Sequence, residues 1–294
     1  MTDIIKTAST EAVTCACAND PDTKILRRVS SLSDFPLAPR GNGPWRRVAV
    51  LDVESTGTDP LTDEIIDIAV VILVVDADGA IVEIESAGQA LRDPGVPIPE
   101  AITRLTGITD EDVAGKTIDL DRLERRIANA DVRIAHNAQF DIAFVENLMP
   151  GLAELPWACS MRDFDWIAAG FDGRKLGHLL MQIRRYHDAH RAMADVVSLI
   201  HLLAHRLPSG MTVMGELLVN ARLDTIRFEA TGAPFEKRGL LKSRGYRWDA
   251  AKKVWWIEIG DDDYADEQLW LRRYISPYGP SPRALSITWH QRHR

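Results

Sequence analysis

The stretch VLDVESTG, residues 50–57, places two carboxylates two positions apart inside an apolar run. The run is typical of a buried strand, and residues i and i+2 of a strand point to the same face. Asp52 and Glu54 therefore lie side by side, with Val53 pointing the other way. Two adjacent carboxylates repel each other, and burying them is costly unless a cation lies between them. This strand must either expose its end or obtain a counter-charge.

Bulk composition limits the classes of protein and partner. The 294 residues allow one large or two smaller domains, and 46% hydrophobic content is enough for a core. With a net charge of −8, the chain needs a local basic patch or bound cations to bind a polyanion. Cys15, Cys17 and Cys159 are too few for a disulfide framework, and no His/Cys cluster completes a zinc site. We expect a reduced, cytoplasmic compartment, because we find neither a signal-peptide pattern nor a run of transmembrane length.

The sequence divides into four parts. Pro and Gly reach linker density at residues 37–44, and the composition changes again after residues 207–210. We expect a flexible lead over 1–44, a main domain over 45–208, a small α+β domain over 213–275 and a disordered basic tail over 276–294.

The main domain begins with three strands and continues with alternating strands and helices, which indicates a mixed α/β sheet flanked by helices. The turn signal at residues 76–79 joins the second and third strands into an antiparallel meander. The segment 97–115 is typical of short helical pieces. The expected strands cover 45–54, 64–76, 80–91, 132–137 and 156–161. The expected helices cover 118–130, 138–149, 162–169, 175–186 and 191–206.

The small domain is predicted to contain a strand at 225–230, a hairpin at 246–259 and helices at 235–245 and 266–275. Aromatic and basic residues alternate in the hairpin, which suits stacking and phosphate contacts with a single strand. A small domain also needs large apolar residues for its core, so both interpretations stay open. The residues concerned are Arg247, Trp248, Lys252, Lys253, Trp255 and Trp256, with Lys237, Arg238, Lys242 and Arg244 on the adjoining helix.

Two further segments place an acid at the start of a helix. AHNAQFD, residues 135–141, runs from a strand end into a helix, with Asp141 in the first turn. HRAMAD, residues 190–195, opens a long helix, with Asp195 in the first or second turn. An acid at this position gains roughly 0.3–1 kcal/mol from the helix dipole, which is sufficient to explain either residue by itself.

Together, the four carboxylates indicate one common site. In open α/β sheets, sites form where the carboxyl ends of strands meet the starts of helices, and Gly57 permits a sharp turn there. Four acids in one place repel strongly without divalent cations, and all-oxygen ligands suit Mg²⁺ or Mn²⁺ rather than zinc. Two ions about 3.5–4 Å apart can stabilise both the attacking and the leaving oxygen of a phosphodiester displacement. Such cations would also supply the positive field that receives phosphate.

His190 is the candidate general base of this site. Five helical positions separate it from Asp195, a rotation of about 140°, so the two cannot share a helix face. We therefore expect His190 on the loop before the helix, where an imidazole can take a proton from the attacking water. An ordinary surface role is the alternative. The other histidines of this region, His187 among them, are expected to have surface or packing roles.

The three segments DVESTG, HNAQFD and HRAMAD resemble, in this order, the exonuclease motifs of the DnaQ-like (DEDDh) 3′–5′ exonucleases. The segment 97–115 is similar to the family's sequence between its first two motifs, and the resemblance covers residues 45–206. It implies a ribonuclease H-like fold with a five-stranded mixed sheet. It also implies a catalytic set that is complete in this chain, namely Asp52, Glu54, Asp141, His190 and Asp195.

The resemblance further implies that 5′-mononucleotides are removed from a 3′ end with the help of two Mg²⁺ or Mn²⁺ ions. Asp52, Glu54 and Asp195 would hold the first ion, and Asp52 and Asp141 the second. His190 would orient and deprotonate the attacking water.

A binding site for the terminal nucleotide is also implied. Main-chain groups just after Glu54 would approach its 3′-hydroxyl. Apolar side chains would pack against the last bases, with packing in the protein core as the competing interpretation, and one amide would orient the strand end or be purely structural. The main-chain groups belong to Ser55, Thr56 and Gly57, the apolar side chains to Leu105, Ile108 and Phe140, and the amide to Asn137.

We therefore predict a metal-dependent 3′–5′ exonuclease that acts on single-stranded or frayed DNA ends, in repair or proofreading. A 3′–5′ exoribonuclease that trims RNA or short oligonucleotides is the alternative, because discrimination depends on contacts to the 2′-hydroxyl. A non-catalytic nucleic-acid-binding scaffold is disfavoured by the complete catalytic set. Nucleic acid is the expected partner, without a membrane. A polymerase or clamp partner lacks support, since EQLWL (267–271) is only faintly similar to a clamp-binding peptide and is predicted to be helical.

Overall fold

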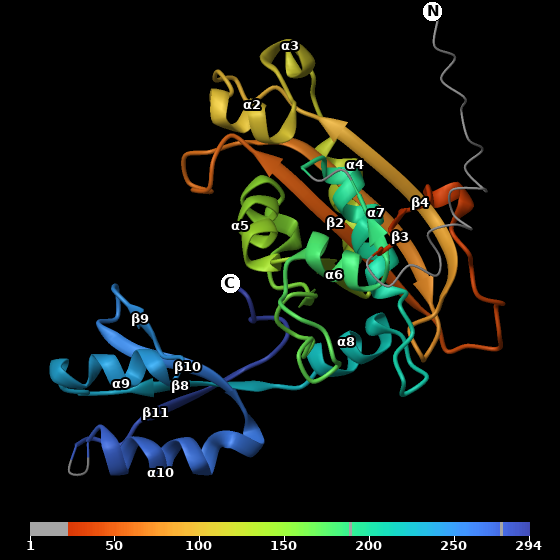
Figure 1. Ribbon diagram of the computed structural model, residues 1–294. Helices are drawn as coiled ribbons and strands as arrows, with labels where there is room; N and C mark the ends of the chain where they lie inside the picture. Colours follow the sequence, from red (N-terminus) through yellow and green to blue (C-terminus); the bar gives the residue numbers. More distant parts are fainter. Residues whose placement is uncertain (1–22, 188–189, 277–278) are drawn as a thin grey trace, which may run out of the picture.

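The main domain is built on one five-stranded sheet with the strand order β4-β3-β2-β5-β6 (Figure 1). The computed structural model describes residues 23–187, 190–276 and 279–294, and Cys15 and Cys17 lie outside these ranges. Strands β4, β3 and β2 are antiparallel, while β5 and β6 run parallel to β2, which confirms the predicted mixed sheet. The strands are β2 (Arg46–Ser55), β3 (Ile65–Val75), β4 (Ile81–Leu91), β5 (Val132–Ala135) and β6 (Trp157–Cys159).

Helices cover both faces of this sheet, because its central strands are apolar on both sides. Every residue of β3 is buried. Val48 and Val50 of β2 enter one core, whereas Ala49 and Leu51 enter another on the opposite face. Helices α6, α7 and α8 pack in the first core, and α4 and α5 in the second (Figure 1). They span α4 (Leu120–Ala128), α5 (Ala138–Leu148), α6 (Leu176–Gln182), α7 (Ala192–Leu203) and α8 (Val213–Ala221), of which α8 was not predicted.

Two short helices, α2 (Glu100–Thr106) and α3 (Asp110–Val113), confirm the helical pieces expected over 97–115. A separate small apolar cluster holds them to the sheet. Within the described ranges, no helix has the length and apolarity needed to cross a membrane. Short 3₁₀ turns lie at Leu32–Asp34, Pro150–Leu152, Phe235–Lys237 and Asp261–Asp263.

The segment 162–169 forms turns rather than the expected helix. Asp163 Oδ2 accepts a hydrogen bond from the Cys159 amide at 2.7 Å, and Trp166 Nε1 donates to the Ser160 carbonyl at 2.7 Å. These side-chain bonds to nearby backbone groups hold the chain in a loop and override its local helix propensity.

The described part of the N-terminal lead, residues 23–44, docks on the main domain, contrary to the expectation of a flexible segment. Strand β1 (Arg27–Arg28) pairs in parallel with β7 (Arg185–Tyr186). Phe35 is buried in the core that contains α7. These contacts are long-range in sequence, which is why the local pattern did not reveal them.

The small C-terminal domain contains a four-stranded antiparallel sheet with the order β11-β8-β10-β9. Helices α9 and α10 pack on one of its faces through their own apolar core, which confirms the predicted α+β composition. The 267–271 segment lies in α10, as the helix prediction required. The elements are β8 (Thr225–Ala230), α9 (Arg238–Ser243), β9 (Arg247–Asp249), β10 (Val254–Gly260), α10 (Tyr264–Tyr274) and β11 (Arg283–Ile287).

The tail over 276–294 is ordered where the structure describes it, so the prediction of a disordered tail is wrong there. Residues 283–287 form β11 along β8, and the chain then returns to the main domain (Figure 1). His293 Nε2 lies 2.8 Å from Asp163 Oδ2. The partner strand of β11 lies far back in the sequence, and the proline-rich flank concealed the strand pattern.

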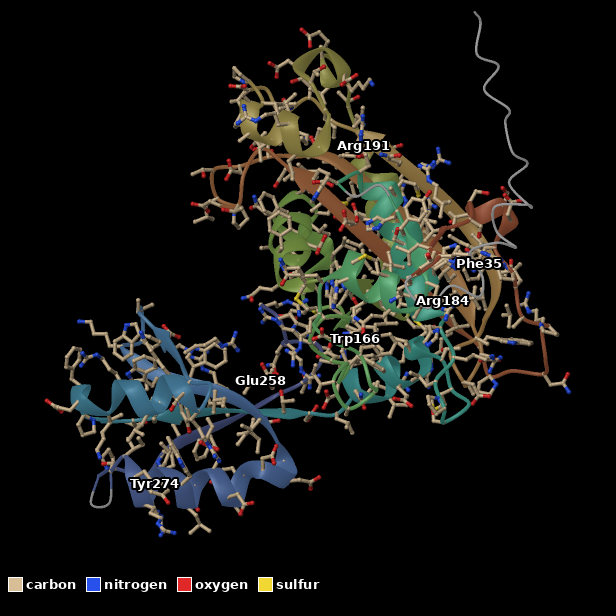
Figure 2. The ribbon with its side chains drawn as sticks, viewed as in Figure 1. Phe35, Trp166, Arg184, Arg191, Glu258 and Tyr274 are labelled. Carbon is tan, nitrogen blue, oxygen red and sulfur yellow. The ribbon has the colours of Figure 1, made fainter. Side chains whose placement is uncertain are left out.

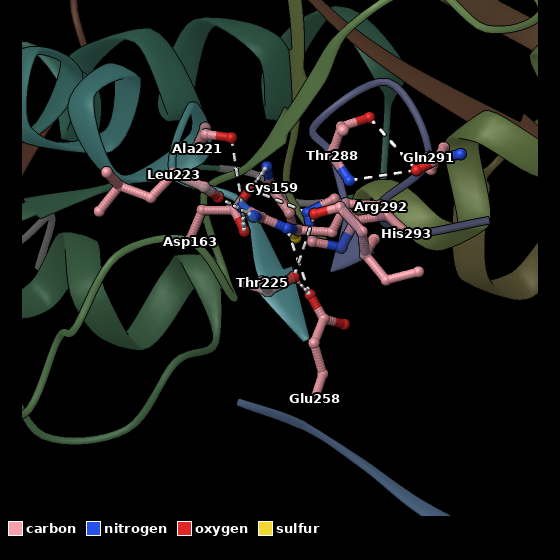
Figure 3. A network of polar contacts seen from close by, with 11 residues as sticks. Cys159, Asp163, Ala221, Leu223, Thr225, Glu258, Thr288, Gln291, Arg292 and His293 are labelled. Carbon is pink, nitrogen blue, oxygen red and sulfur yellow. Dashed lines mark hydrogen bonds and ion pairs between the residues drawn. The ribbon is translucent and has the colours of Figure 1, made fainter. Parts of the chain in front are cut away.

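Figure 3 shows the polar network between the two domains, in which Arg292 is the central side chain. It is 4% exposed. Its Nη1 lies 3.5 Å from Asp163 Oδ1 and donates to the Ala221 carbonyl at 3.2 Å, while Nη2 donates to the Leu223 carbonyl. Its Nε lies 3.2 Å from Glu258 Oε1, without the geometry of a hydrogen bond. This network, here called the domain joint, connects β6 of the main domain to β10 of the small domain.

Candidate functional site

Three carboxylates converge at the end of β2. Asp52 and Glu54 lie two positions apart on that strand, and Asp195 lies in the first turn of α7, which packs along β2. One oxygen of each carboxylate lies within 4.8 Å of the other two. A bulge between Glu54 and Ser55 interrupts the pairing of β2 with β3 directly after the pair. Irregularities of this kind redirect side chains at strand ends.

Asp141 joins this group from α5, on the opposite face of the sheet. It lies in the first turn of the helix, which starts after the N-cap residue Asn137 with φ 70°. Its side chain is 2% exposed, and Oδ1 accepts a hydrogen bond from the Val53 amide at 3.3 Å. Because Val53 lies between Asp52 and Glu54, this bond fixes Asp141 beside them. We call these four acids the acidic cluster: Asp52, Glu54, Asp141 and Asp195.

Burial and repulsion act on these carboxyl groups in the same direction. Burial raises the pKa of Asp52 well above its ordinary value, and repulsion from Asp141 and Asp195 raises it further. Burial also raises the pKa of Asp141. Burial, followed by repulsion from Asp195, raises the pKa of Glu54 to about 7. The site therefore concentrates negative charge that a bound cation would relieve.

Asp67 is a fifth acid at this end of the sheet, and the sequence prediction did not include it. It is fully buried on β3, directly opposite Glu54, and Gln89 Nε2 donates to its Oδ2 at 2.7 Å. Its Oδ1 has no hydrogen-bond partner among the described residues. Burial raises the pKa of Asp67, and its charge in turn contributes to the raised pKa of Glu54. The signal that could have revealed it is a lone acid inside the apolar run IIDIAVV.

The acidic cluster fits hard divalent cations. Its donors are carboxylate oxygens, which Mg²⁺ and Mn²⁺ prefer, and it contains no thiolate. Attraction from Arg191 is the weakest of the causes acting on the Glu54 carboxyl, so it offsets little of the repulsion. Cations held among these carboxylates would supply the missing positive charge.

Two histidines flank Asp195 with different contacts. His187 Nε2 lies 2.9 Å from Asp195 Oδ1, and its side chain is 5% exposed. The amides of His190 and Arg191 donate to Asp195 Oδ2 at 2.8 and 3.2 Å. His190 precedes α7, as expected, with φ 67°, and its exposed imidazole makes no hydrogen bond within the described part of the chain. The contact of His187 with Asp195 corrects the expectation of a surface or packing role.

The turn that follows β2 is fixed by Asp63. Thr56 Oγ1 donates to Asp63 Oδ1 at 3.2 Å and accepts from the Glu64 amide at 3.0 Å. Ser55 Oγ donates to the Gly57 carbonyl at 2.5 Å. Gly57 lies so close to the Asp63 carboxylate that any Cβ at this position would collide with it. The three residues predicted near the terminal nucleotide thus form one rigid turn beside the acidic cluster.

The structure separates the residues predicted to contact bases into accessible and buried ones. Leu105 on α2 is 50% exposed, and Phe140 on α5 is half-buried with its ring 4.8 Å from that of Phe144. Ile108 is completely buried in the cluster under α2 and α3, so it is not accessible to a base, and that expectation is corrected. Asn137 is half-buried in a left-handed conformation that asparagine tolerates well.

His136, in the second motif, has both ring nitrogens engaged. Nδ1 lies 2.7 Å from Ser160 Oγ, and Nε2 lies 2.9 Å from the Arg174 carbonyl. Burial lowers the pKa of His136 to about 4, against attraction from Asp195. A neutral imidazole that links three segments next to the site has a structural role.

A mixed sheet flanked by helices, with acids at the end of its central strand and at two helix starts, defines a ribonuclease H-like nuclease. The chain belongs to the RNase_T family of exonucleases, whose family model matches residues 49–203. It is therefore a DnaQ-type exonuclease, an enzyme that degrades nucleic acid from an end.

Curated relatives of the chain are PolC-type DNA polymerases III. That of Thermotoga petrophila is 31% identical over 164 residues, which make up 55% of this chain and 10% of the relative. That of Clostridium perfringens is 43% identical over 104 residues, or 34% and 7% of the two chains. The chain thus spans no more than a tenth of the length of these relatives.

Similar solved structures are exonucleases of low sequence identity. Exonuclease X in complex with 5′ overhanging duplex DNA is 21% identical with a TM-score of 0.40, over 57% of this chain and 99% of that one. E. coli Exonuclease I in complex with a 5cy-dT13 oligonucleotide is 15% identical with a TM-score of 0.47, over 62% and 47% of the two chains.

Proposed function

We propose that this chain is a divalent-metal-dependent 3′–5′ exonuclease that releases 5′-mononucleotides from single-stranded or frayed DNA ends. The observation that carries the proposal is the convergence of Asp52, Glu54 and Asp195 within 4.8 Å, with Asp141 bound to the amide between the first two. The order of the three sequence motifs supports the 3′–5′ polarity.

In this proposal Asp52, Glu54 and Asp195 hold one divalent ion, and Asp52 and Asp141 hold a second. Divalent ions supply Lewis acidity and charge stabilisation to phosphodiester cleavage when bound. The protein's own contribution is to hold the carboxylates in place. Asp195 is oriented through both of its oxygens, by the amides of the preceding loop and by His187.

His190 is the proposed general base, which takes a proton from the attacking water at its imidazole. Its backbone is anchored to Asp195, whereas its side chain is exposed and without a hydrogen bond to the described residues, so it can turn toward a bound end. His187 is less suited to this role, because its Nε2 is already engaged with the Asp195 carboxylate. A positioned base of this kind contributes typically about 10²–10⁴-fold to a rate.

DNA is the proposed substrate because the curated relatives are DNA polymerases. The rigid turn of Ser55, Thr56 and Gly57 is proposed to lie against the terminal nucleotide, with Leu105 and Phe140 against the last bases. Asn137 begins α5 at the same place and would orient the strand end.

Oligomers labelled at the 3′ or the 5′ end test the proposal, with DNA and RNA of the same sequence incubated in parallel, with Mn²⁺ or with EDTA. We expect immediate release of the label as a mononucleotide from 3′-labelled DNA and a descending ladder from 5′-labelled DNA. EDTA should stop both. Release of the 5′ label first would contradict the polarity, faster loss of RNA would contradict the substrate, and activity in EDTA would contradict the metal requirement.

A further inference from the structure

Within residues 213–276 and 279–294, helices pack on one face of the C-terminal sheet only, where α9 and α10 share its apolar core. Phe228, Trp255 and Ile257 point to the core beneath α9 and α10. Residues directly opposite each other on paired strands share a face, so Trp256 of β10 and Arg247 of β9 lie together on the other side. Figure 2 shows Glu258, two positions beyond Trp256, on the side of the sheet next to the main domain, and Tyr274 of α10 on the far side.

Two guanidinium groups lie against the ring of Trp256. Arg247 lies 4.2 Å from the ring centroid, and Arg227, which comes from the strand on the other side of β10, lies 4.1 Å from it. Contacts of a guanidinium with an indole ring are favourable and reduce the freedom of the long side chain. The tryptophan therefore holds both arginines in place on the open face.

The two arginines differ in their charge partners. Arg227 is neutralised by Glu229 at 2.8 Å and Asp249 at 2.7 Å. Arg247 forms no ion pair with a described residue, and neither does Arg162, which is exposed on the loop after β6. Asp163, the neighbour of Arg162 in the chain, contacts Arg292, which lies 3.2 Å from Glu258 on the same face as Trp256. Burial lowers the pKa of Arg247, and repulsion from Arg162 lowers it further, against attraction from Glu258, which is itself paired with Arg292. Like charges whose nearby acid already has a cationic partner form a place for an anion.

The domain joint keeps these cations on the side of the active site. Asp163, which binds Arg292, directly follows Arg162 in the chain. Ser160, two positions earlier, contacts His136, and that histidine lies near enough to Asp195 for the carboxylate to affect its pKa. The segment of Ser160 and Asp163 therefore contacts His136 at one end and, through Arg292, Glu258 on the open face at the other.

We propose that Arg162 and Arg247, the latter held by Trp256, bind backbone phosphates of the single strand upstream of the end that is being cleaved. We call this pair of arginines with Trp256 the basic face. A single-stranded polyanion fits because the charge is complementary and because the face lies beside the site that shortens such strands, so the inference rests on the proposed function. On the helix side, Arg244 is less suitable, since it is paired with Glu267.

The test measures binding of the full chain to 5′-fluorescein-labelled dT30 in EDTA, where no turnover interferes. Arg247→Gln and Arg162→Gln should each weaken binding by about 5–30-fold, as expected for a central charged contact. Each should also reduce the slope of log Kd against log salt by about 0.7, the value for one phosphate contact to a single strand. Arg247→Lys, which keeps the charge, should retain the wild-type slope.

The matched control is Arg273→Gln, which makes the same charge change on the exposed side of α10. It should leave both the Kd and the salt slope unchanged. Equal effects of Arg273→Gln and Arg247→Gln, or an unchanged slope in both test variants, would overturn the inference. With Mn²⁺, the test variants should also lose the preference of the enzyme for dT30 over dT3 by the same 5–30-fold factor, about that of one central contact. Absence of degradation by the wild type would contradict the proposed function, whereas the binding result in EDTA would still decide the inference.

Discussion

The acidic cluster and the domain joint both bury charged side chains, but they treat the charge in opposite ways. In the domain joint, the Asp163 carboxylate contacts Arg292 and His293 and also accepts a hydrogen bond from the Cys159 amide. In the acidic cluster, carboxylates from β2, α5 and α7 approach each other, and burial together with repulsion from these neighbours raises the pKa of Asp52 and of Glu54. Matched charges connect parts of the fold, whereas unmatched like charges mark a place where a ligand of opposite sign is missing.

The basic face repeats the same contrast with the sign reversed. Arg227 has two carboxylate partners and belongs to the fold, while Arg247 and Arg162 have none among the described residues. The molecule thus carries a place for cations and a place for a polyanion, connected by the domain joint. This arrangement explains how a chain with a net charge of −8 can bind nucleic acid.

The largest expected effect is the loss of turnover when one acid of the acidic cluster loses its charge. Asp141→Asn keeps an acceptor for the Val53 amide and removes the charge, so we expect about 10³-fold lower turnover, the upper end of the range for losing one electrostatic contact. The metal-free protein should become more stable, because repulsion falls. Turnover of labelled dT30 and thermal melting in EDTA measure the two effects. Glu111→Gln, an exposed acid on α3, is the control, and normal turnover of Asp141→Asn would refute the assignment.

Substitutions of the two histidines beside Asp195 should separate the loss of the general base from the loss of an oriented metal ligand. His190→Gln should lower kcat by about 10²-fold or more, because the proposed base is lost, while Mn²⁺ affinity stays the same. His187→Gln should instead weaken Mn²⁺ binding, because it orients a ligand. Isothermal titration with Mn²⁺ and single-turnover rates separate the two. Unchanged kcat in His190→Gln would assign the base elsewhere.

Disruption of the domain joint should lower the free energy of unfolding, whereas disruption of the acidic cluster should lower turnover. Arg292→Met leaves Asp163 buried without its guanidinium, so the free energy of unfolding should fall by about 3 kcal/mol. Denaturant titration measures this change. The exposed Arg272→Met on α10 provides the comparison and should have little effect. A fully stable Arg292→Met would show that the joint does not depend on matched charge.

The pH dependence of the metal-free protein should be of similar size to the effect of Arg292→Met but spread over more than two pH units. The pKa of Glu54 rises from 4.5 to about 7 on folding, so the folded state binds more protons than the unfolded state in this interval. Stability should therefore fall as pH increases from about 4.5 to 7, by ~3 kcal/mol from this residue. Glu54→Gln should reduce the slope without abolishing it, because Asp52, Asp141 and Asp67 also have raised pKa values and contribute with the same sign. Mn²⁺ should oppose the slope by favouring the ionised form. A slope of the opposite sign would mean that the carboxyl has a cationic partner.

Much of the main domain could be predicted because its signals are local. The apolar runs of β2 and β3 specify a buried sheet, and an acid within such a run, or at a helix start, is conspicuous. Asp67 was missed although it stands in an apolar run, because its position opposite Glu54 depends on the register of β2 and β3. His187 was missed because its contact with Asp195 depends on the geometry of the connecting loop.

The parts that sequence could not predict depend on distant partners. Strand β11 is stabilised by β8, and its own composition resembles a loop. The 162–169 segment has helical composition, but Asp163 and Trp166 bind backbone groups of the preceding residues and hold it in turns. Asp163 is also held by Arg292 and His293 of the C-terminal segment, so distant partners oppose local preference in both cases.

The most direct test of the central claim is an anomalous difference map at the manganese edge, from crystals of the full chain grown in Mn²⁺. The account predicts one anomalous peak in direct contact with carboxylate oxygens of Asp52, Glu54 and Asp195, and a second peak between Asp52 and Asp141. In Asp141→Asn crystals, the second peak should weaken or disappear. A map with manganese bound elsewhere, or with these carboxylates turned away from one another, would contradict the account.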